Sequence, residues 1–115
     1  MVLGVGVEPG TPVEYLRDAV DALGDLTFDT VATIDRRAGE PAVLALAAGR
    51  VLRTYTVAEL DAVEVPNPSV VVRRLTGTGS VAEAAAILAA RERGGVADLV
   101  VEKQRGRGVT VAVAR

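Results

Sequence analysis

Apolar residues in this chain form short, nearly continuous runs separated by stretches with helical periodicity. Three of these runs, at residues 2–7, 31–35 and 51–55, predict strands, and the first lacks the polar alternation of a half-exposed strand. Two more runs, at residues 98–102 and 108–114, predict strands that pair as an antiparallel hairpin, because only a short polar stretch separates them.

Capping motifs place helices between the strands. Thr11, Pro12 and Glu14 provide an N-cap, a proline at the first helical position and an acidic third position, which together mark a helix start. We expect this helix to end at Gly24. Its apolar stripe consists of Val13, Leu16, Val20 and Leu23.

Two shorter helices are predicted in the middle of the chain. Pro41, with Glu40 or Gly39 near the N-cap, opens a helix that ends at Gly49. Thr56 and Glu59 have the spacing of a capping box and open another helix, which runs to about residue 63.

The stretch at residues 77–88 combines a glycine-rich turn with a helix start. Ser80 is the expected N-cap, Glu83 completes a capping box, and Gly94 or Gly95 ends the helix. The expected apolar face consists of Val81, Ala84, Ala85 and Leu88. Free amides at such a helix start attract carboxylate and phosphate groups. An ordinary tight turn with a cap explains the same residues, so both interpretations stand.

The alternation of strands and helices predicts an α/β fold. We expect a three-layer sandwich around a mixed, mostly parallel sheet of about five strands, ending in the antiparallel hairpin. The 115 residues suit a single domain that spans residues 1–115, and the sequence contains no linker or repeat.

The composition excludes several kinds of chemistry. Half of the residues are apolar, and the chain contains no Cys and no His. Thiol nucleophiles, imidazole bases, Ser-His-Asp triads, disulfides and soft metal sites are therefore impossible within this chain. Only a metal site built entirely from oxygen ligands could form, and the spacing of an EF-hand is missing. We expect no resident cofactor or metal.

The charge and hydropathy of the chain argue against nucleic-acid and membrane partners. The formal net charge is −2 and aromatic residues make up only 3% of the chain, which argues against binding to nucleic acid. The N-terminus lacks the basic region of a signal peptide, and no apolar run approaches the ~20 residues of a membrane span. We therefore expect a cytoplasmic protein without a membrane partner. The valines at residues 70–72 could support a homodimer.

Six pieces of the sequence, in order, resemble the CobE/CbiG C-terminal domain family of cobalamin-biosynthesis proteins, and together they cover essentially the whole chain. The pieces are Gly4-Val5-Gly6 followed by Gly10-Thr11; Ala32-Thr33-Ile34-Asp35 followed by Glu40-Pro41; Tyr55 with Ala58-Glu59-Leu60; Val65-Pro66-Asn67-Pro68-Ser69; the stretch from Gly77 to Ala86; and Lys103 followed by the stretch from Val109 to Arg115.

The sequence departs from the family pattern in one loop. Members usually carry cysteine and basic residues after the first Gly-x-Gly, where this chain has Val7-Glu8-Pro9. Two-domain members of the family carry an additional N-terminal domain, so this chain resembles the stand-alone, CobE-like form.

The resemblance implies a precorrin or corrin intermediate as the ligand, a flat macrocycle fringed with acetate and propionate carboxylates. Any cobalt would then be carried by the macrocycle, and other enzymes of the pathway could be partners. The residues that we expect to contact the ligand are Gly6, Thr11, Thr33, Arg37, Asn67, Ser69, Gly77, Thr78, Gly79, Ser80 and Lys103. Further arginines that could pair with carboxylates, or simply form a solvated surface, are Arg36, Arg73, Arg74, Arg105 and Arg107.

Three functions are open on the sequence. The first is an accessory protein that binds a tetrapyrrole intermediate. The second is the catalytic part of a cobalt-precorrin-5A hydrolase, which opens the ring-A lactone and releases acetaldehyde, with Asp35 or Glu40 as the base. A helix cap or an ion pair explains Asp35 equally well. The third, a nucleotide- or acyl-binding module, is disfavoured because Gly4-x-Gly6 lacks the third glycine of the dinucleotide fingerprint.

Overall fold

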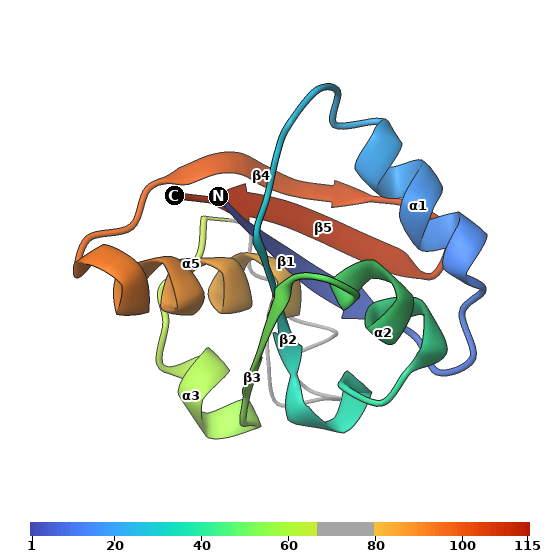
Figure 1. Ribbon diagram of the computed structural model, residues 1–115. Helices are drawn as coiled ribbons and strands as arrows, with labels where there is room; N and C mark the ends of the chain where they lie inside the picture. The colour runs from blue at the N-terminus through green and yellow to red at the C-terminus, as the bar shows by residue number, and fades with distance from the viewer. Residues whose placement is uncertain (67–79) are drawn as a thin grey trace.

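The computed structural model describes residues 1–66 and 80–115. In the described part the chain forms one five-stranded sheet with the strand order β3-β2-β1-β5-β4 (Figure 1). The strands are β1 (Val2–Val7), β2 (Thr30–Ile34), β3 (Val51–Tyr55), β4 (Leu99–Arg105) and β5 (Val109–Ala114). The helices are α1 (Val13–Asp21), the 3-10 turn η1 (Asp35–Arg37), α2 (Pro41–Ala47), α3 (Val57–Asp61) and α5 (Val81–Gly94).

The sheet is mixed, and only part of it is parallel. β1 pairs in parallel with β2, and β2 with β3, whereas β5 is antiparallel to both β1 and β4. The prediction of a mostly parallel sheet is therefore wrong, because the last strand inserts beside β1 and runs against it. The α/β class and the antiparallel hairpin are confirmed. Val2 pairs with Ala114, so the two chain ends lie side by side (Figure 1).

The hairpin is tighter than the sequence predicted. β4 extends to Arg105, so that Lys103 lies within the strand and the connection shrinks to residues 106–108. Gly108 has φ = +65°, a left-handed conformation that glycine adopts without strain. The expected edge loop is instead an extension of the sheet, and it carries basic side chains to the end of β4.

The buried apolar residues form two clusters. Val2, Ala32 and Ile34 belong to a cluster with α3 and α5, while Leu3 and Val31 belong to a cluster with α1 and α2. Successive side chains of a strand point to opposite faces of the sheet, so the two clusters lie on opposite faces. Figure 1 shows α1 and α2 next to each other, away from α3 and α5.

The capping predictions were right for the short helices. At α3 the Thr56 hydroxyl accepts the Glu59 N–H (3.1 Å) and the Glu59 carboxylate accepts the Thr56 N–H (2.9 Å), which completes the capping box. At α2 the N-cap is Glu40 and Pro41 occupies the first helical position, as expected.

The cap predicted for α1 is wrong, whereas at α5 the predicted N-cap residue is right but its capping box does not form. The N-cap of α1 is Pro12, because the Thr11 hydroxyl donates instead to the backbone oxygen of Glu8 (2.7 Å). At α5, Ser80 is the N-cap but makes no capping hydrogen bond, and the Glu83 carboxylate accepts the backbone N–H of Lys103 (3.0 Å). Thr11 and Glu83 thus bond to backbone groups outside their helices.

Helix α5 packs unusually close to β1. A Cβ atom built on Gly4 would overlap the backbone oxygen of Ala82 and lie 2.9 Å from the Cβ of Ala86. The strand neighbours of Gly4 are Ala32 and Ala112, so small residues meet on both sides of the contact. The expected stripe of four residues on α5 is too narrow. The fully buried residues of α5 include Ala82, Ala84, Ala85, Ala86, Ala89 and Ala90.

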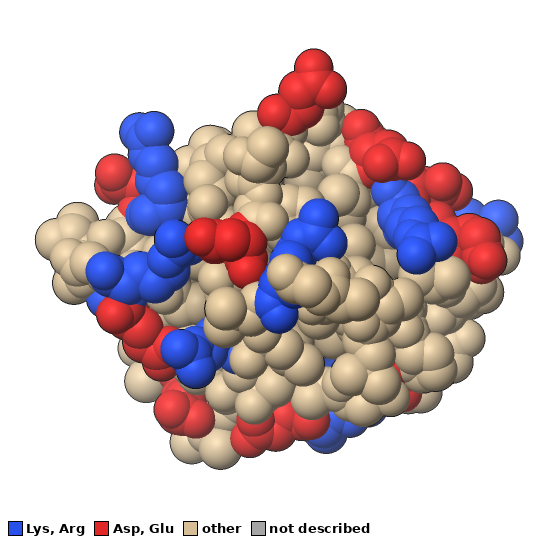
Figure 2. Space-filling view, viewed as in Figure 1, with Lys and Arg blue, Asp and Glu red and all other residues tan. Residues whose placement is uncertain are grey.

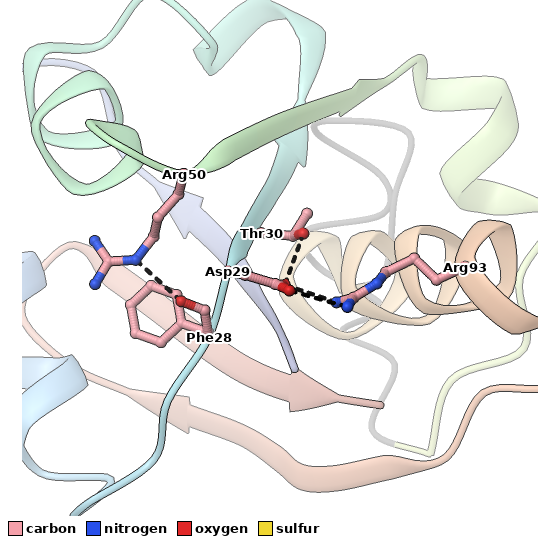
Figure 3. Close-up of polar contacts among 5 residues, drawn as sticks. All are labelled: Phe28, Asp29, Thr30, Arg50 and Arg93. Atoms are coloured by element: carbon pink, nitrogen blue, oxygen red, sulfur yellow. Dashed lines mark hydrogen bonds and ion pairs between the residues drawn. The ribbon is translucent and has the colours of Figure 1, made fainter.

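Polar contacts fasten the start of β2 to two other elements (Figure 3). The Arg93 guanidinium, near the end of α5, donates two hydrogen bonds to the Asp29 carboxylate (2.7 and 2.9 Å), and the Thr30 hydroxyl donates a third (3.0 Å). Arg50, the residue before β3, donates to the backbone oxygen of Phe28 (3.1 Å) and lies over its ring. These contacts fix the amino end of β2, opposite the end at which the candidate site lies.

Candidate functional site

A cleft with a volume of about 410 Å³ lies where β1 and β2 end and α5 begins. The hairpin between β4 and β5 forms one wall of this cleft. The residues that line it are Gly6, Val7, Glu8, Pro9, Ile34, Arg36, Arg37, Ser80, Val81, Ala82, Lys103, Arg105, Gly106, Gly108, Val109 and Thr110. In sheets with parallel strands, ligands usually bind beyond the carboxyl ends of those strands. The cleft lies at this edge of the sheet.

The lining carries an excess of positive charge. Among the described residues of the lining, the cationic side chains are Arg36, Arg37, Lys103 and Arg105, and the single acidic side chain is Glu8. The whole chain, by contrast, has a net charge of −2, and the face shown in Figure 2 has acidic and basic side chains interspersed. The excess of cationic side chains in the cleft thus contrasts with the net negative charge of the chain. A site of this kind attracts a ligand that bears several carboxylates or phosphates.

The base of the cleft is mostly apolar or small. Ile34, at the end of β2, is 3% exposed, and Val109, at the start of β5, is 4% exposed. Gly6 faces the first turn of α5, where a Cβ atom would lie 3.6 Å from the Cβ of Val81. Because that is ordinary van der Waals contact, Gly6 leaves room for about one methyl group between strand and helix.

Arg37 is oriented by the backbone of β1. Its Nε donates to the backbone oxygen of Val7 (3.1 Å), while the two terminal nitrogens donate to none of the described residues. A guanidinium held in this way can present its remaining N–H groups to a carboxylate. The 3-10 turn η1 supplies this residue because it follows β2 directly at the cleft.

Ser80 and Glu83 differ sharply in their surroundings, although both are buried. Ser80 lines the cleft and is 6% exposed, and its Oγ makes no hydrogen bond with any described residue. Glu83 is 0% exposed and ties α5 to β4 through the N–H of Lys103. A buried carboxylate at this position was not predicted as a link between elements, because the capping-box motif offered a local partner.

Four of the residues that we expected to bind a ligand lie together in this cleft. They are Gly6, Arg37, Ser80 and Lys103, which come from β1, η1, the start of α5 and β4. The residues Asn67, Ser69, Gly77, Thr78 and Gly79 lie outside the described residues, as do Arg73, Arg74 and the valines at 70–72.

The other predicted residues have structural partners or lie away from the lining. Thr33 is fully buried, and its hydroxyl donates to the backbone oxygen of Val5 (2.7 Å). The Thr11 hydroxyl is bound to Glu8, and the Glu40 carboxylate accepts the N–H of Gly10 (2.8 Å). Asp35 is exposed at the start of η1. Arg107 lies over the ring of Tyr15, 4.3 Å from its centre.

Several lining residues were missed because they carry no distinctive chemistry. Ile34, Val81 and Val109 resemble any core residue in the sequence, and Thr110 resembles any strand residue. The position of Ile34 at the end of a predicted strand was the only available signal, since the ends of neighbouring parallel strands meet at one edge of a sheet.

The described residues contain neither a metal site nor a membrane span. No group of three or more Asp and Glu side chains among residues 1–66 and 80–115 could hold a metal ion. Within the same ranges, no helix has the length and hydropathy that a membrane crossing requires.

Comparison with known proteins identifies the family. Residues 1–114, nearly the whole chain, match the family described as cobalamin synthesis G C-terminus. The chain belongs to this CbiG C-terminal family. The family resemblance predicted from the sequence is therefore confirmed, and this is a cobalamin-biosynthesis protein of the CobE/CbiG C-terminal family.

Curated and solved relatives agree with this assignment. Protein CobE from a Sinorhizobium species is 40% identical over 126 residues, which cover 99% of this chain and 79% of that protein. The crystal structure of CobE, a protein from the cobalamin (vitamin B12) biosynthetic pathway, has a TM-score of 0.88 and 34% identity, covering 99% of this chain and 91% of the other. The cobalamin biosynthesis protein chiG from Agrobacterium tumefaciens str. C58 has a TM-score of 0.70 and 28% identity, with coverages of 98% and 95%.

Proposed function

We propose that this CobE/CbiG C-terminal family protein binds a precorrin or corrin intermediate at the cleft between β1, β2 and α5. The observation that carries the proposal is the pairing of a cationic rim with an apolar base in a chain whose net charge is negative. Tetrapyrrole intermediates of this pathway have the complementary chemistry, a flat apolar ring fringed with carboxylates. Membership of a cobalamin-biosynthesis family supports this class of ligand.

The size of the cleft suits one edge of such a ring. Its volume of about 410 Å³ falls within the range of roughly 300–1,000 Å³ that is typical of ligand pockets. A whole corrin with its side chains is larger than the cleft, so one edge of the macrocycle enters and the rest stays outside. Any cobalt would be carried by the macrocycle itself.

The arginines at the rim would hold the carboxylates of the ligand. Arg37 and Arg105 lie on different elements that border the cleft, η1 and β4, so they can bind different carboxylates of one macrocycle. Guanidinium groups bind carboxylates with two parallel hydrogen bonds, which fixes orientation as well as adding affinity. The ring face would pack on the apolar base near Ile34 and Val109.

An absorbance titration tests the proposal. The probe is cobyrinic acid, a corrin whose peripheral side chains are free carboxylates, and its comparison is cobinamide, in which those side chains are amides. We expect the visible spectrum of cobyrinic acid to shift on binding, and cobinamide to bind much more weakly. Raising the salt concentration should weaken binding, because exposed charges are screened within a Debye length of about 10 Å at 0.1 M ionic strength.

Variants at the rim supply the control. Arg37→Ala and Arg105→Ala should each weaken binding of cobyrinic acid roughly tenfold or more, since a hydrogen bond to a charged group contributes about 1.5–3 kcal/mol. Arg17→Ala removes an exposed arginine of α1 that does not line the cleft and should leave the affinity unchanged. Equal affinity in all three variants, or no binding by the wild type, would refute the proposal.

The hydrolase alternative stays a prediction that the same preparation can test. Among the described residues, neither suggested base lines the cleft, and Glu40 already accepts a hydrogen bond from Gly10. Incubation with a lactone-containing cobalt-precorrin should release no acetaldehyde if the protein only binds its ligand. Release of acetaldehyde by the wild-type protein, lost in the variant Asp35→Asn, would instead favour catalysis.

A further inference from the structure

The hydroxyl of Ser80 is a buried donor without a partner among the described residues. Ser80 lines the cleft, it is 6% exposed, and its Oγ makes no hydrogen bond with any described residue. Buried side-chain hydroxyls are nearly always hydrogen-bonded, so an orphan at the wall of a cleft indicates a place where a ligand atom belongs. The usual explanation, a helix cap, does not apply because the Ser80 side chain accepts nothing from α5.

Two backbone amides lie beside this hydroxyl. Val81 and Ala82 are the first residues of α5, a helix of 14 residues, and both line the cleft. Amides in the first turn have no partner within the helix, and no described residue accepts a hydrogen bond from either of them. The helix dipole adds a partial positive charge at this point.

Gly6 keeps space open in front of these donors. A Cβ atom at Gly6 would lie 4.0 Å from the amide nitrogen of Ala82 and 3.6 Å from the Cβ of Val81. An alanine at this position would therefore fit without a clash, while its methyl group would occupy part of the space that faces the amide. The small residue is not needed for packing here, in contrast to Gly4, where a Cβ would overlap α5.

The charges around the subsite favour an anion. Arg37 and Lys103 line the same cleft. The Glu83 carboxylate is also in the first turn of α5, but it accepts the backbone N–H of Lys103 on β4 and does not line the cleft. Of the charged side chains that line the cleft among the described residues, four are cationic and one, Glu8, is acidic, so positive charge prevails.

We propose that Ser80 Oγ and the amides of Val81 and Ala82 form a subsite for a single carboxylate, and that this subsite discriminates a carboxylate from a carboxamide. A carboxylate only accepts hydrogen bonds and satisfies all three donors, whereas the NH₂ group of an amide would turn further donors toward them. The identity of the carboxylate, a peripheral side chain of the tetrapyrrole, rests on the proposed function. The preference of the subsite for an anion that only accepts hydrogen bonds does not depend on the proposed function.

Small probes test the subsite without the macrocycle. Propionate and propionamide have the same shape and differ in charge and donors. We would titrate each into ¹⁵N-labelled protein and follow the amide signals of Val81 and Ala82 by NMR. We expect saturable shifts of both signals with propionate and no saturable shift with propionamide.

Substitutions at Ser80 and Gly6 test the hydroxyl and the space in front of it separately. Ser80→Ala removes the orphan Oγ and should keep or slightly raise the melting temperature, because no existing hydrogen bond is lost. It should weaken propionate binding by about tenfold, the change expected for a hydrogen bond to a charged group. Gly6→Ala should fold normally and also weaken propionate, while Ser80→Thr, which retains the hydroxyl, should restore binding relative to Ser80→Ala.

Each outcome decides the proposal. Similar shifts with propionate and propionamide, or undiminished propionate binding in Ser80→Ala, would overturn the subsite. If cobyrinic acid binds but the signals of Val81 and Ala82 do not respond to propionate, the subsite fails and the proposed function survives. If propionate binds in a Ser80-dependent way but cobyrinic acid does not bind, the subsite survives and the proposed function fails.

Discussion

Asp29 shows how a single exposed residue can join two elements. Its carboxylate accepts hydrogen bonds from the Thr30 hydroxyl and from two guanidinium nitrogens of Arg93 (Figure 3). The Thr30 hydrogen bond, followed by the hydrogen bonds and charge of Arg93, lowers the pKa of Asp29 below its ordinary value of 3.8. The start of β2 is thereby held to the end of α5 by the ionised form of this side chain.

The pH dependence of stability follows from this shift. A folded pKa below the unfolded value means that the carboxylate stabilises the fold fully above the unfolded pKa, and that this contribution is lost as the pH falls through the folded pKa. We expect Asp29→Asn to lower the urea midpoint at neutral pH, and the difference from wild type to vanish as the pH falls through the lowered pKa of Asp29. Asp25→Asn, an exposed change in the same connection, should have little effect. A difference that persists in acid would contradict the assignment.

Thr33 illustrates a residue with a predicted ligand role and an observed structural bond. Its hydroxyl donates to the backbone oxygen of Val5 from a fully buried position. We expect Thr33→Val to destabilise the protein by about 1 kcal/mol, the usual net value of a buried hydrogen bond, and to leave the affinity for cobyrinic acid unchanged. Urea unfolding and the absorbance titration measure the two effects, with exposed Thr27→Val as the control. Lost affinity at unchanged stability would mean that Thr33 contacts the ligand.

At the residue scale, sequence motifs predicted local capping residues better than they predicted the hydrogen-bond partners of side chains. The capping box at Thr56 formed as predicted because both partners are local. The same spacing at Ser80 did not, because the backbone N–H of Lys103, 20 residues further on, takes the Glu83 carboxylate. A motif specifies a bond only when no tertiary partner competes for it.

At the scale of elements, the contact between β1 and α5 sets the position of the cleft. Gly4 allows the backbone of α5 to approach the strand at Ala82, which brings the first turn of the helix to the end of β1. Gly6 lies two residues later on the same face of β1, opposite that first turn of α5. The pair of glycines thus has two separate tasks, one in packing and one at the cleft.

Substitution by alanine separates the two glycines. Gly4→Ala should destabilise the protein by about 2 kcal/mol or more, because overpacking of a well-filled core typically costs about 1–3 kcal/mol and here the obstacle is backbone. Gly6→Ala should change stability by less than about 1 kcal/mol, since its new methyl group would be in ordinary contact. Urea unfolding measures both. A tolerated Gly4→Ala would mean that α5 can withdraw from the sheet without loss.

At the scale of the whole molecule, the cleft gathers residues that are far apart in the chain. Its lining comes from residues 6–9, 34–37, 80–82 and 103–110. The carboxyl ends of β1 and β2 could be expected at one edge from the sequence, because both strands were predicted and parallel strands align their ends. The contribution of β4 could not be, since Lys103 and Arg105 were assigned to a loop and are in a strand.

The sequence alone determined the α/β class, the five strands, the hairpin and the family, because each depends on local periodicity, turn residues or motifs in a fixed order. Only the tertiary structure decided that the sheet is half antiparallel and that Gly6, Arg37, Ser80 and Lys103 share one cleft. It also decided that the Ser80 hydroxyl bonds to no described residue, while the Glu83 carboxylate accepts a hydrogen bond from β4. Strand order and side-chain partners depend on which distant segments compete for the same surface and the same hydrogen bonds, and a local pattern carries no record of that competition.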